Sequence, residues 1–119
     1  LARFIGNSFQ KIFEYLNIEK NLIYSSEIDK NNGLKAQSKV IEICKKLNAD
    51  VYINAIGGAD LYSSRDFSDN GISLKYIKTN FEEYKQFRTP FIPGLSIIDI
   101  LMFNSPQEIN RMLDNYELI

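Results

Sequence analysis

A helical pattern between two short apolar runs is the feature that most constrains how this chain folds. The runs are residues 22–25 and 50–54, and both have the composition of strands. Residues 34–47 between them predict one amphipathic helix. Its apolar face consists of Leu34, Val40, Ile41, Cys44 and Leu47. A strand, a helix and a strand over this length form a βαβ unit, so the two strands are predicted to be parallel, with a right-handed crossover. The alternation at residues 72–78 predicts a third strand with one face toward water.

Two further helices flank this unit. Residues 2–17 place apolar side chains three and four positions apart, which indicates an amphipathic helix. Residues 95–103 are apolar nearly all round, so this helix is expected to be buried. Ser96, with Asp99 three residues later, is predicted to cap its start.

The last predicted helix has the strongest start signal in the chain. Ser105 is placed as the N-cap, Pro106 as the first helical residue and Glu108 as the third. The side chains that this helix is expected to bury are Ile109, Met112, Leu113 and Tyr116.

Together these elements predict an α/β fold. We expect three layers, with a short, mainly parallel sheet and flanking helices, forming a Rossmann-like piece of a larger fold. No repeat or linker interrupts the sequence, so residues 1–119 are predicted to form a single domain. Leu1 is not a Met and already lies within a helical pattern, so we expect the chain to be the C-terminal part of a longer protein.

The composition excludes several kinds of chemistry. There is no His, so these residues cannot form a Ser-His-Asp triad, a Cys-His pair or a His metal site. The single Cys44 excludes an internal disulfide and a thiolate zinc site, and it fits a reducing cytoplasm. The 14 basic and 15 acidic residues give a net charge of −1, which argues against a nucleic-acid partner. No apolar run reaches the roughly 20 residues of a membrane helix, so we expect no membrane span and a cytoplasmic location.

The second strand runs into a glycine-containing loop at residues 55–60. In open α/β sheets ligands bind beyond the carboxyl ends of the strands, and backbone N–H groups suit a phosphate or a carboxylate. The loop is neither a Walker loop nor a dinucleotide fingerprint, so a tight turn with no ligand is the alternative interpretation. Asp60 could accept hydrogen bonds from a ribose or sugar hydroxyl or bind Mg²⁺ with a phosphate, or it could form a local cap or Asx turn. The residues of the predicted ligand site are Asn54, Gly57, Gly58, Asp60 and Tyr62.

Other polar residues have simpler interpretations. Glu82 and Glu83 are expected to be a solvated pair, and Cys44 a buried, inert thiol. Arg65 and Arg88 are cations that could pair with a phosphate, although each is more typical of a surface charge. The segment 79–93 has no clear periodicity, and loops of this length often carry function.

A series of motifs covers most of the chain. Residues 52–62 carry the Gly-Gly loop, residues 71–72 open a strand, residues 84–87 read Tyr-Lys-Gln-Phe, and residues 91–99 lead into the apolar helix. In this order they resemble the C-terminal half of the WbqC-like family. The resemblance implies a bacterial protein, often of O-antigen or other surface-polysaccharide gene clusters, with a glycine-transferase role suggested for some members. It also implies a preceding N-terminal part, similar to nucleotide-binding α/β proteins, and it supplies no catalytic residue.

The sequence therefore leaves two hypotheses about function, an enzyme and an interaction module. The first is half of a cytoplasmic transferase that moves a glycyl, amino-acyl or similar group. The loop would hold the phosphate of a nucleotide-linked small molecule, while Asp60 and Tyr62 orient a hydroxyl. Its catalytic residues and cofactor stay unassigned, no metal is predicted, and this piece alone is expected to be inactive. The alternative is a non-catalytic interaction or oligomerisation module, which docks another subunit or its own N-terminal region through the apolar C-terminal helices.

Overall fold

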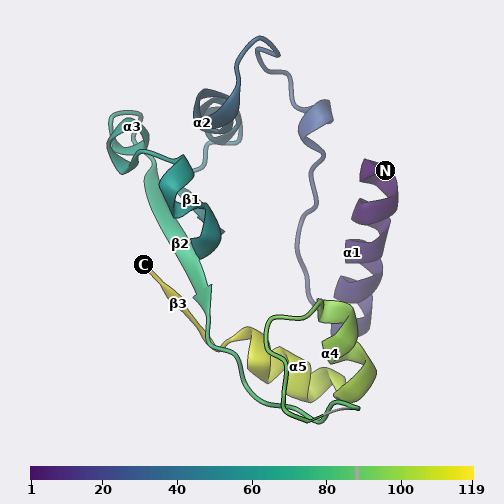
Figure 1. The fold of residues 1–119 in the computed structure, drawn as a ribbon. Helices are drawn as coiled ribbons and strands as arrows, with labels where there is room; N and C mark the ends of the chain where they lie inside the picture. The colour runs from purple at the N-terminus through teal and green to yellow at the C-terminus, as the bar shows by residue number, and fades with distance from the viewer. Residues whose placement is uncertain (88) are drawn as a thin grey trace. The chain divides into compact units, whose positions relative to one another are not determined.

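The computed structural model describes residues 1–87 and 89–119 (Figure 1). Its elements are, in chain order, α1 (Ala2–Leu16), η1 (Ser25–Glu27), α2 (Ala36–Lys46), β1 (Val51–Ala55), η2 (Ile56–Leu61), α3 (Ser64–Ser68), β2 (Ser73–Thr79), α4 (Ile97–Phe103), α5 (Pro106–Leu113) and β3 (Tyr116–Leu118). The chain divides into two compact units. The first consists of Leu1–Leu22 and Thr79–Tyr116, and the second of Ile23–Lys78 and Glu117–Ile119. The prediction of a single domain over residues 1–119 stays a prediction.

The described sheet has three strands in the order β1-β2-β3. β1 and β2 are parallel, in a register that pairs Val51 with Ser73 and Ala55 with Ile77. Tyr76 and Ile119 exchange two backbone hydrogen bonds of 2.9 Å, as opposed residues of antiparallel strands do. The sheet is therefore mixed, and the predicted α/β class is confirmed at this level.

The strand predicted at residues 22–25 is wrong. Residues 21–24 have no regular structure, and residues 25–27 form the short 3₁₀ helix η1. The side chains of Leu22 and Ile23 are 41% and 57% exposed. An apolar run of four residues has no periodicity that separates a strand from an irregular segment, and a strand also needs a partner. The parallel pair is instead β1 and β2, so the crossover passes through η2 and α3 rather than through α2.

The core of the second unit is built around one aromatic ring. Phe67 in α3 is completely buried, and its ring stacks on Tyr52 of β1 with centroids 5.4 Å apart and planes 10° apart. Tyr62 meets Phe67 edge-on at 5.9 Å. The other buried members of this cluster are Ile41, Cys44 and Ile72. The predicted position of Cys44 on the core face of α2 is therefore confirmed.

Local signals explain the short helix that carries Phe67. The Ser63 hydroxyl accepts a hydrogen bond from the backbone N–H of Asp66 and so caps the start of α3. Gly71, with a φ of 74°, follows the helix in the left-handed conformation that glycine tolerates best. These two residues set the length of α3, and they place Phe67 between α2 and the sheet.

In the first unit, the C-terminal end of α1 packs against α5. Leu16 is buried, and the Asn110 side chain donates a hydrogen bond of 3.0 Å to the Leu16 carbonyl. Asn17 ends the helix in the left-handed conformation, with a φ of 55°. The apolar stripe continues toward the N-terminus, where Phe4 is 77% exposed. The predicted amphipathic helix is confirmed, but the contacts within this unit bury only its last turn.

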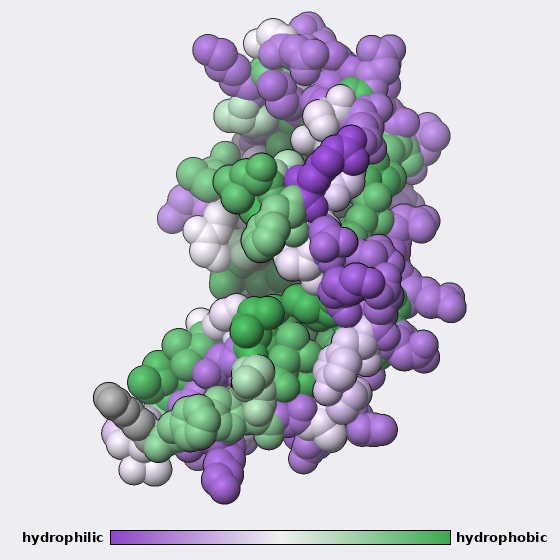
Figure 2. Space-filling view, turned by 90° about the vertical axis from the view of Figure 1, so that its right-hand side faces the viewer, coloured by the Kyte–Doolittle hydropathy of each residue, from purple (hydrophilic) through white to green (hydrophobic). Residues whose placement is uncertain are grey.

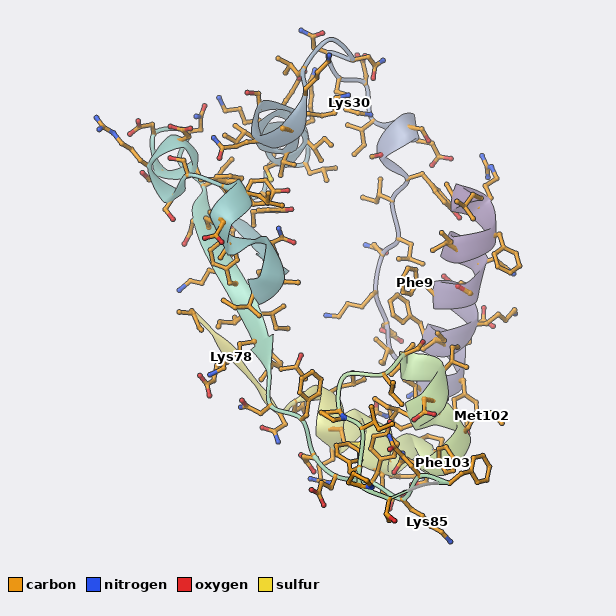
Figure 3. All side chains as sticks on the ribbon, in the orientation of Figure 1. Phe9, Lys30, Lys78, Lys85, Met102 and Phe103 are labelled. Atoms are coloured by element: carbon orange, nitrogen blue, oxygen red, sulfur yellow. The ribbon has the colours of Figure 1, made fainter. Side chains whose placement is uncertain are left out.

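The prediction that α4 is buried is wrong. None of its residues is buried, and Ile98 and Met102 are 54% and 77% exposed. Met102 projects outward from the helix, whereas Phe103 lies among other rings (Figure 3). A two-turn helix with apolar residues on every side cannot bury all of them against one neighbour. Hydrophobic side chains accordingly reach the surface in several places (Figure 2).

The start of α5 is confirmed, whereas its end is earlier than predicted. The Ser105 and Glu108 side chains form the reciprocal capping box, with Pro106 at the first position. Ile109 is fully buried, Met112 is half-buried and Leu113 is exposed. Tyr116 lies in β3 and is exposed, because the chain leaves the helix at Asp114 to pair with β2. Among the described residues, no helix combines the length and apolar character that crossing a membrane requires.

We expect Phe67→Ala to lower the free energy of unfolding by about 3–5 kcal/mol, because it removes a fully buried ring from a small core. The matched control is Phe4→Ala, which removes the same side chain from an exposed position and should change stability by about 0.5 kcal/mol or less. Denaturant titrations followed by circular dichroism measure both. Equal losses in the two variants would contradict the assigned core.

Candidate ligand-binding loop

The predicted site residues lie around the carboxyl end of β1. This strand ends at Ala55 and continues directly into η2, which contains both loop glycines. Because β1 and β2 are parallel, their carboxyl ends meet at the same edge of the sheet. The position matches the one at which open α/β sheets bind ligands. Whether a ligand binds there stays a prediction.

The two glycines have different surroundings. A Cβ atom added to Gly57 would meet nothing within 4 Å. A Cβ atom added to Gly58 would lie only 2.8 Å from Nδ2 of Asn54. Neither glycine has a positive φ; the glycines that do are Gly71 and Gly94. A side chain at Gly58 would thus push the Asn54 amide group aside, and glycine is not needed there for a left-handed backbone.

The Asn54 side chain is anchored at the start of this loop. Its Oδ1 accepts a hydrogen bond of 2.9 Å from the backbone N–H of Ala55. This bond turns Nδ2 toward Gly58. A half-buried amide group therefore lies where the strand passes into the loop.

Asp60 and Tyr62 have different environments. The Asp60 side chain is exposed and makes no hydrogen bond or ion pair with the described residues, so no cap or Asx turn involves its carboxylate there. Tyr62 is half-buried, and its ring contacts Tyr52 and Phe67 edge-on at 5.9 Å each. Asp60 is available to a ligand at the surface, whereas the ring of Tyr62 belongs to the core cluster.

The sequence did not predict that Tyr76 of β2 contacts this loop. Its hydroxyl donates a hydrogen bond of 3.2 Å to the carbonyl of Ala59, and in the register of the sheet Tyr76 pairs with Asn54. The two side chains therefore hold the two halves of the loop from neighbouring strands. The alternation of residues 72–78 predicts a strand, but it does not show which strand lies beside it. Only a predicted pairing of β1 with β2 would have placed Tyr76 next to Asn54.

Burial changes the acidity of two groups beneath the loop. It raises the pKa of Tyr52 to about 12, with the Tyr62 hydroxyl contributing as a hydrogen-bond neighbour. Burial also raises the pKa of the Cys44 thiol. Both groups stay protonated at neutral pH, so neither supplies an anion or a base to the loop.

The remaining polar candidates lie elsewhere. Arg65 is strongly exposed and lies 3.8 Å from Asp69, and Arg88 lies outside the described residues. Glu82 is not simply solvated beside Glu83, because it accepts hydrogen bonds of 2.7 Å from Arg111 and from Asn115. These donors hold the pKa of Glu82 below its usual value. Within residues 1–87 and 89–119, no group of three His, Cys, Asp or Glu side chains could hold a metal ion.

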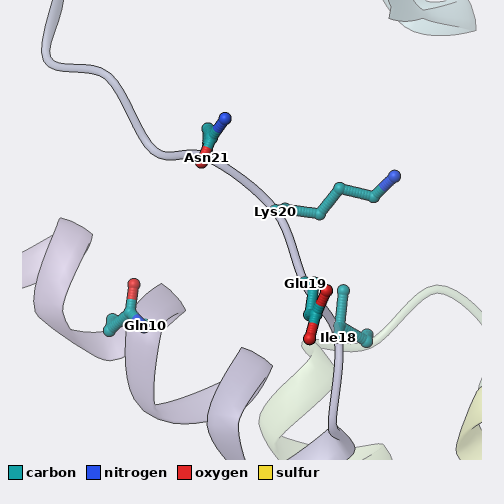
Figure 4. A pocket seen from close by; sticks show the side chains of 5 residues that line it. All are labelled: Gln10, Ile18, Glu19, Lys20 and Asn21. Atoms are coloured by element: carbon teal, nitrogen blue, oxygen red, sulfur yellow. The ribbon is translucent and has the colours of Figure 1, made fainter.

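A separate groove lies beside α1 in the first unit (Figure 4). It has a volume of about 570 Å³ and is lined by Gln10, Ile18, Glu19, Lys20 and Asn21. The groove is wide open and has only one apolar lining residue, whereas small-molecule sites are mostly apolar and enclosed. It gives no support for a second ligand site.

The mixed sheet and the loop at its edge define a small α/β protein with one candidate binding loop. Residues 1–111 match the model of the WbqC-like protein family, so this chain belongs to that family. The resemblance of the motifs is thereby confirmed, while their assignment to the C-terminal half of the family stays a prediction. Neither a curated protein nor a solved structure matches the chain.

The two glycines should respond differently to substitution. We expect Gly57→Ala to be neutral or to stabilise by a few tenths of a kcal/mol, since the added methyl enters open space. Gly58→Ala should cost about 1 kcal/mol more, because Asn54 must move and give up its bond to Ala55. When Asn54 is also replaced by Ala, the difference in stability between Gly57→Ala and Gly58→Ala should vanish. Thermal unfolding of these two variants, each with and without Asn54→Ala, measures it. An undiminished difference would exclude the contact as its cause.

The pKa of Tyr52 predicts alkaline sensitivity. The folded chain holds the phenol proton up to about pH 12, whereas an ordinary tyrosine loses it near 10. This stabilisation is complete below pH 10 and is lost as the pH rises toward 12. We therefore expect wild-type stability to fall more steeply over this range than that of Tyr52→Phe, in urea titrations at stepped pH. Tyr15→Phe, at an exposed tyrosine, should keep the wild-type slope; a wild-type slope in Tyr52→Phe would refute the assignment.

Proposed function

We propose that this chain supplies the phosphate-holding loop of a cytoplasmic transferase in bacterial surface-polysaccharide biosynthesis. The group transferred would be a glycyl, amino-acyl or similar group, and its donor a nucleotide-linked small molecule. Membership of the WbqC-like family supports the biological setting. In this proposal the parallel pair β1/β2 is one piece of a larger three-layer, Rossmann-like sheet.

The observation that carries the proposal is the open space beside Gly57 at the carboxyl end of β1. A side chain at this position would meet nothing within 4 Å, so a phosphate can approach the backbone closely. The exposed carboxylate of Asp60 lies three residues further along the same short helix. Backbone N–H groups suit the phosphate, and a carboxylate suits a ribose or sugar hydroxyl.

The chemistry of this site divides between binding and catalysis. The loop contributes electrostatic positioning, in which N–H groups hold the negative charge of the donor without a mobile cation. Asn54 contributes an amide donor at the base of the loop, and Tyr76 fixes the carbonyl of Ala59. In this proposal the general base for the acceptor belongs to another part of the protein, because this chain has no His.

A second function is favoured by the exposed apolar residues of α4. Ile98 and Met102 are both more than half exposed, which is unusual for a helix of such composition. The alternative is a non-catalytic module that docks another subunit, or its own N-terminal region, through this surface.

Ligand binding to the wild-type chain tests the first proposal. Thermal unfolding is measured with ATP, with a nucleotide-sugar and with free amino acids in turn. A ligand at one hundred times its Kd adds about 2.7 kcal/mol of stability, which gives a clear shift of the melting temperature. Gly57→Val is the informative variant, because the fold has room for its side chain whereas the proposed phosphate does not. Asp60→Asn tests the hydroxyl acceptor, and Asp29→Asn controls for the change of charge.

We expect Gly57→Val to melt like the wild type without ligand and to lose the ligand shift. A shift that survives in both Gly57→Val and Asp60→Asn would place the ligand elsewhere. If the wild type shows no shift, and sedimentation shows association that rises with protein concentration, the interaction module replaces the transferase.

A further inference from the structure

The segment between β2 and α4 is held by side chains. Among its described residues, 80–87 and 89–96, none belongs to a helix or a strand. The segment, which belongs to the first unit, is nevertheless fixed by a contact near its start and by a defined turn near its end. Glu82 binds Arg111 and Asn115 of the α5 region at 2.7 Å, and Gly94 turns the chain with a φ of 70° before α4. Its two ends are thus fixed independently of what lies between them.

The side chain of Gln86 connects two parts of this segment. Its Nε2 donates to the carbonyl of Ile92 at 3.0 Å, and its Oε1 accepts from the Ile92 N–H at 3.0 Å. The side-chain amide therefore pairs with the backbone as a neighbouring strand would. This pairing joins residues 84–87 to residues 89–92.

Asp99 of α4 holds the closed segment on the helix. Its Oδ2 accepts a hydrogen bond of 2.6 Å from the Tyr84 hydroxyl and a longer one of 3.4 Å from Gln86 Nε2. The sequence predicted that Ser96, with Asp99, caps this helix; Ser96 is confirmed as the N-cap, its hydroxyl accepting from the Ile98 N–H, whereas the Asp99 side chain bonds to Tyr84 and Gln86 instead. The Asp99 carboxylate is therefore available to accept hydrogen bonds from residues 84–87.

A group of aromatic rings packs together next to the hydrogen bonds of Asp99. Tyr84 lies edge-on to Phe91 at 5.2 Å and contacts Phe103 of α4 at 6.4 Å. Tyr84 and Gln86 are half-buried, whereas Lys85 and Phe87 between and after them are exposed. Tyr84 and Gln86 thus face α4 and Lys85 points outward (Figure 3), while the exposed ring of Phe87 also lies edge-on to Phe103 of α4, at 4.8 Å.

We propose that residues 84–87 and 89–92 form a strap, latched by Asp99, that opens as a unit while α4 and α5 stay folded. Gln86 couples the two contacts, because the same amide group binds both Asp99 and Ile92. Loss of the Asp99 acceptor frees Tyr84 and Gln86 together and so weakens the pairing with Ile92. The opened strap uncovers the rings of Tyr84, Phe91 and Phe103. The strap is independent of the glycine loop, which lies in the other unit.

Amide hydrogen exchange resolved by NMR tests the latch on the whole chain. We expect Asp99→Ala to raise the exchange rate of the Ile92 amide about tenfold or more, as the loss of a hydrogen bond to a charged acceptor implies. Amides of 100–103 in α4 and of 109–113 in α5 should keep their wild-type rates. Gln86→Ala acts from the strap and leaves the helix untouched, and it should also speed exchange at Ile92. Glu83→Ala removes an exposed carboxylate of the same segment and should change nothing.

Three results would overturn the latch. One is an unchanged Ile92 rate in Asp99→Ala. Another is an equal rise in the strap and in both helices, because the strap would then be part of the global fold. The third is opening in Asp99→Ala with no effect of Gln86→Ala, which would leave the helix start, rather than the coupled strap, as the cause.

Discussion

The stacking of Phe67 on Tyr52 is the contact on which the sheet unit and its loop depend. Tyr52 lies in β1, before η2, and Phe67 lies in α3, after it. The stack therefore fixes both ends of the segment that carries the two loop glycines. Tyr62 meets both rings edge-on and sets the point at which the loop returns to the core. With its ends fixed by burial, the loop between them is free to place small and polar residues at the surface.

Local sequence signals predicted α1, α2, α4 and α5, because each signal acts within one or two turns, whereas the short helix α3 was not predicted. The Ser105 and Glu108 capping box needs only residues three apart, and it appears in the structure as predicted. Strands depend on partners that the local sequence does not name. Among the described residues the run at 22–25 has no partner strand, and Tyr116, predicted in a helix, pairs as part of β3 instead. The α/β class was therefore predictable, whereas the choice of paired strands was not.

The same distinction applies to the candidate site and to the strap. Asn54 and Gly58 are four residues apart, so their shared loop was visible in the sequence, although their contact was not. Tyr76 reaches the loop from a strand 17 residues beyond Ala59, and only the sheet register reveals it. Asp99 was predicted to support the Ser96 cap; Ser96 caps the helix by itself, and Tyr84, 15 residues away, donates a hydrogen bond to the Asp99 carboxylate. When a residue can be explained by its sequence neighbours, as Asp99 can, sequence reasoning overlooks a partner that is distant in the chain.

Because the cores are apolar and the loops are held by polar contacts, the two differ in how easily they open. Although 45% of its residues are hydrophobic, six hydrophobic side chains are buried among the described residues. Such small cores stabilise the helices and strands, and they leave the loops to hydrogen bonds from Asn54, Tyr76, Gln86 and Asp99. Each such bond contributes a net stabilisation of only about 0.5–1.5 kcal/mol, because water competes for the same groups. Loops held in this way open before the cores unfold, so the segments that this chain can offer to a ligand or a partner are also its least stable ones.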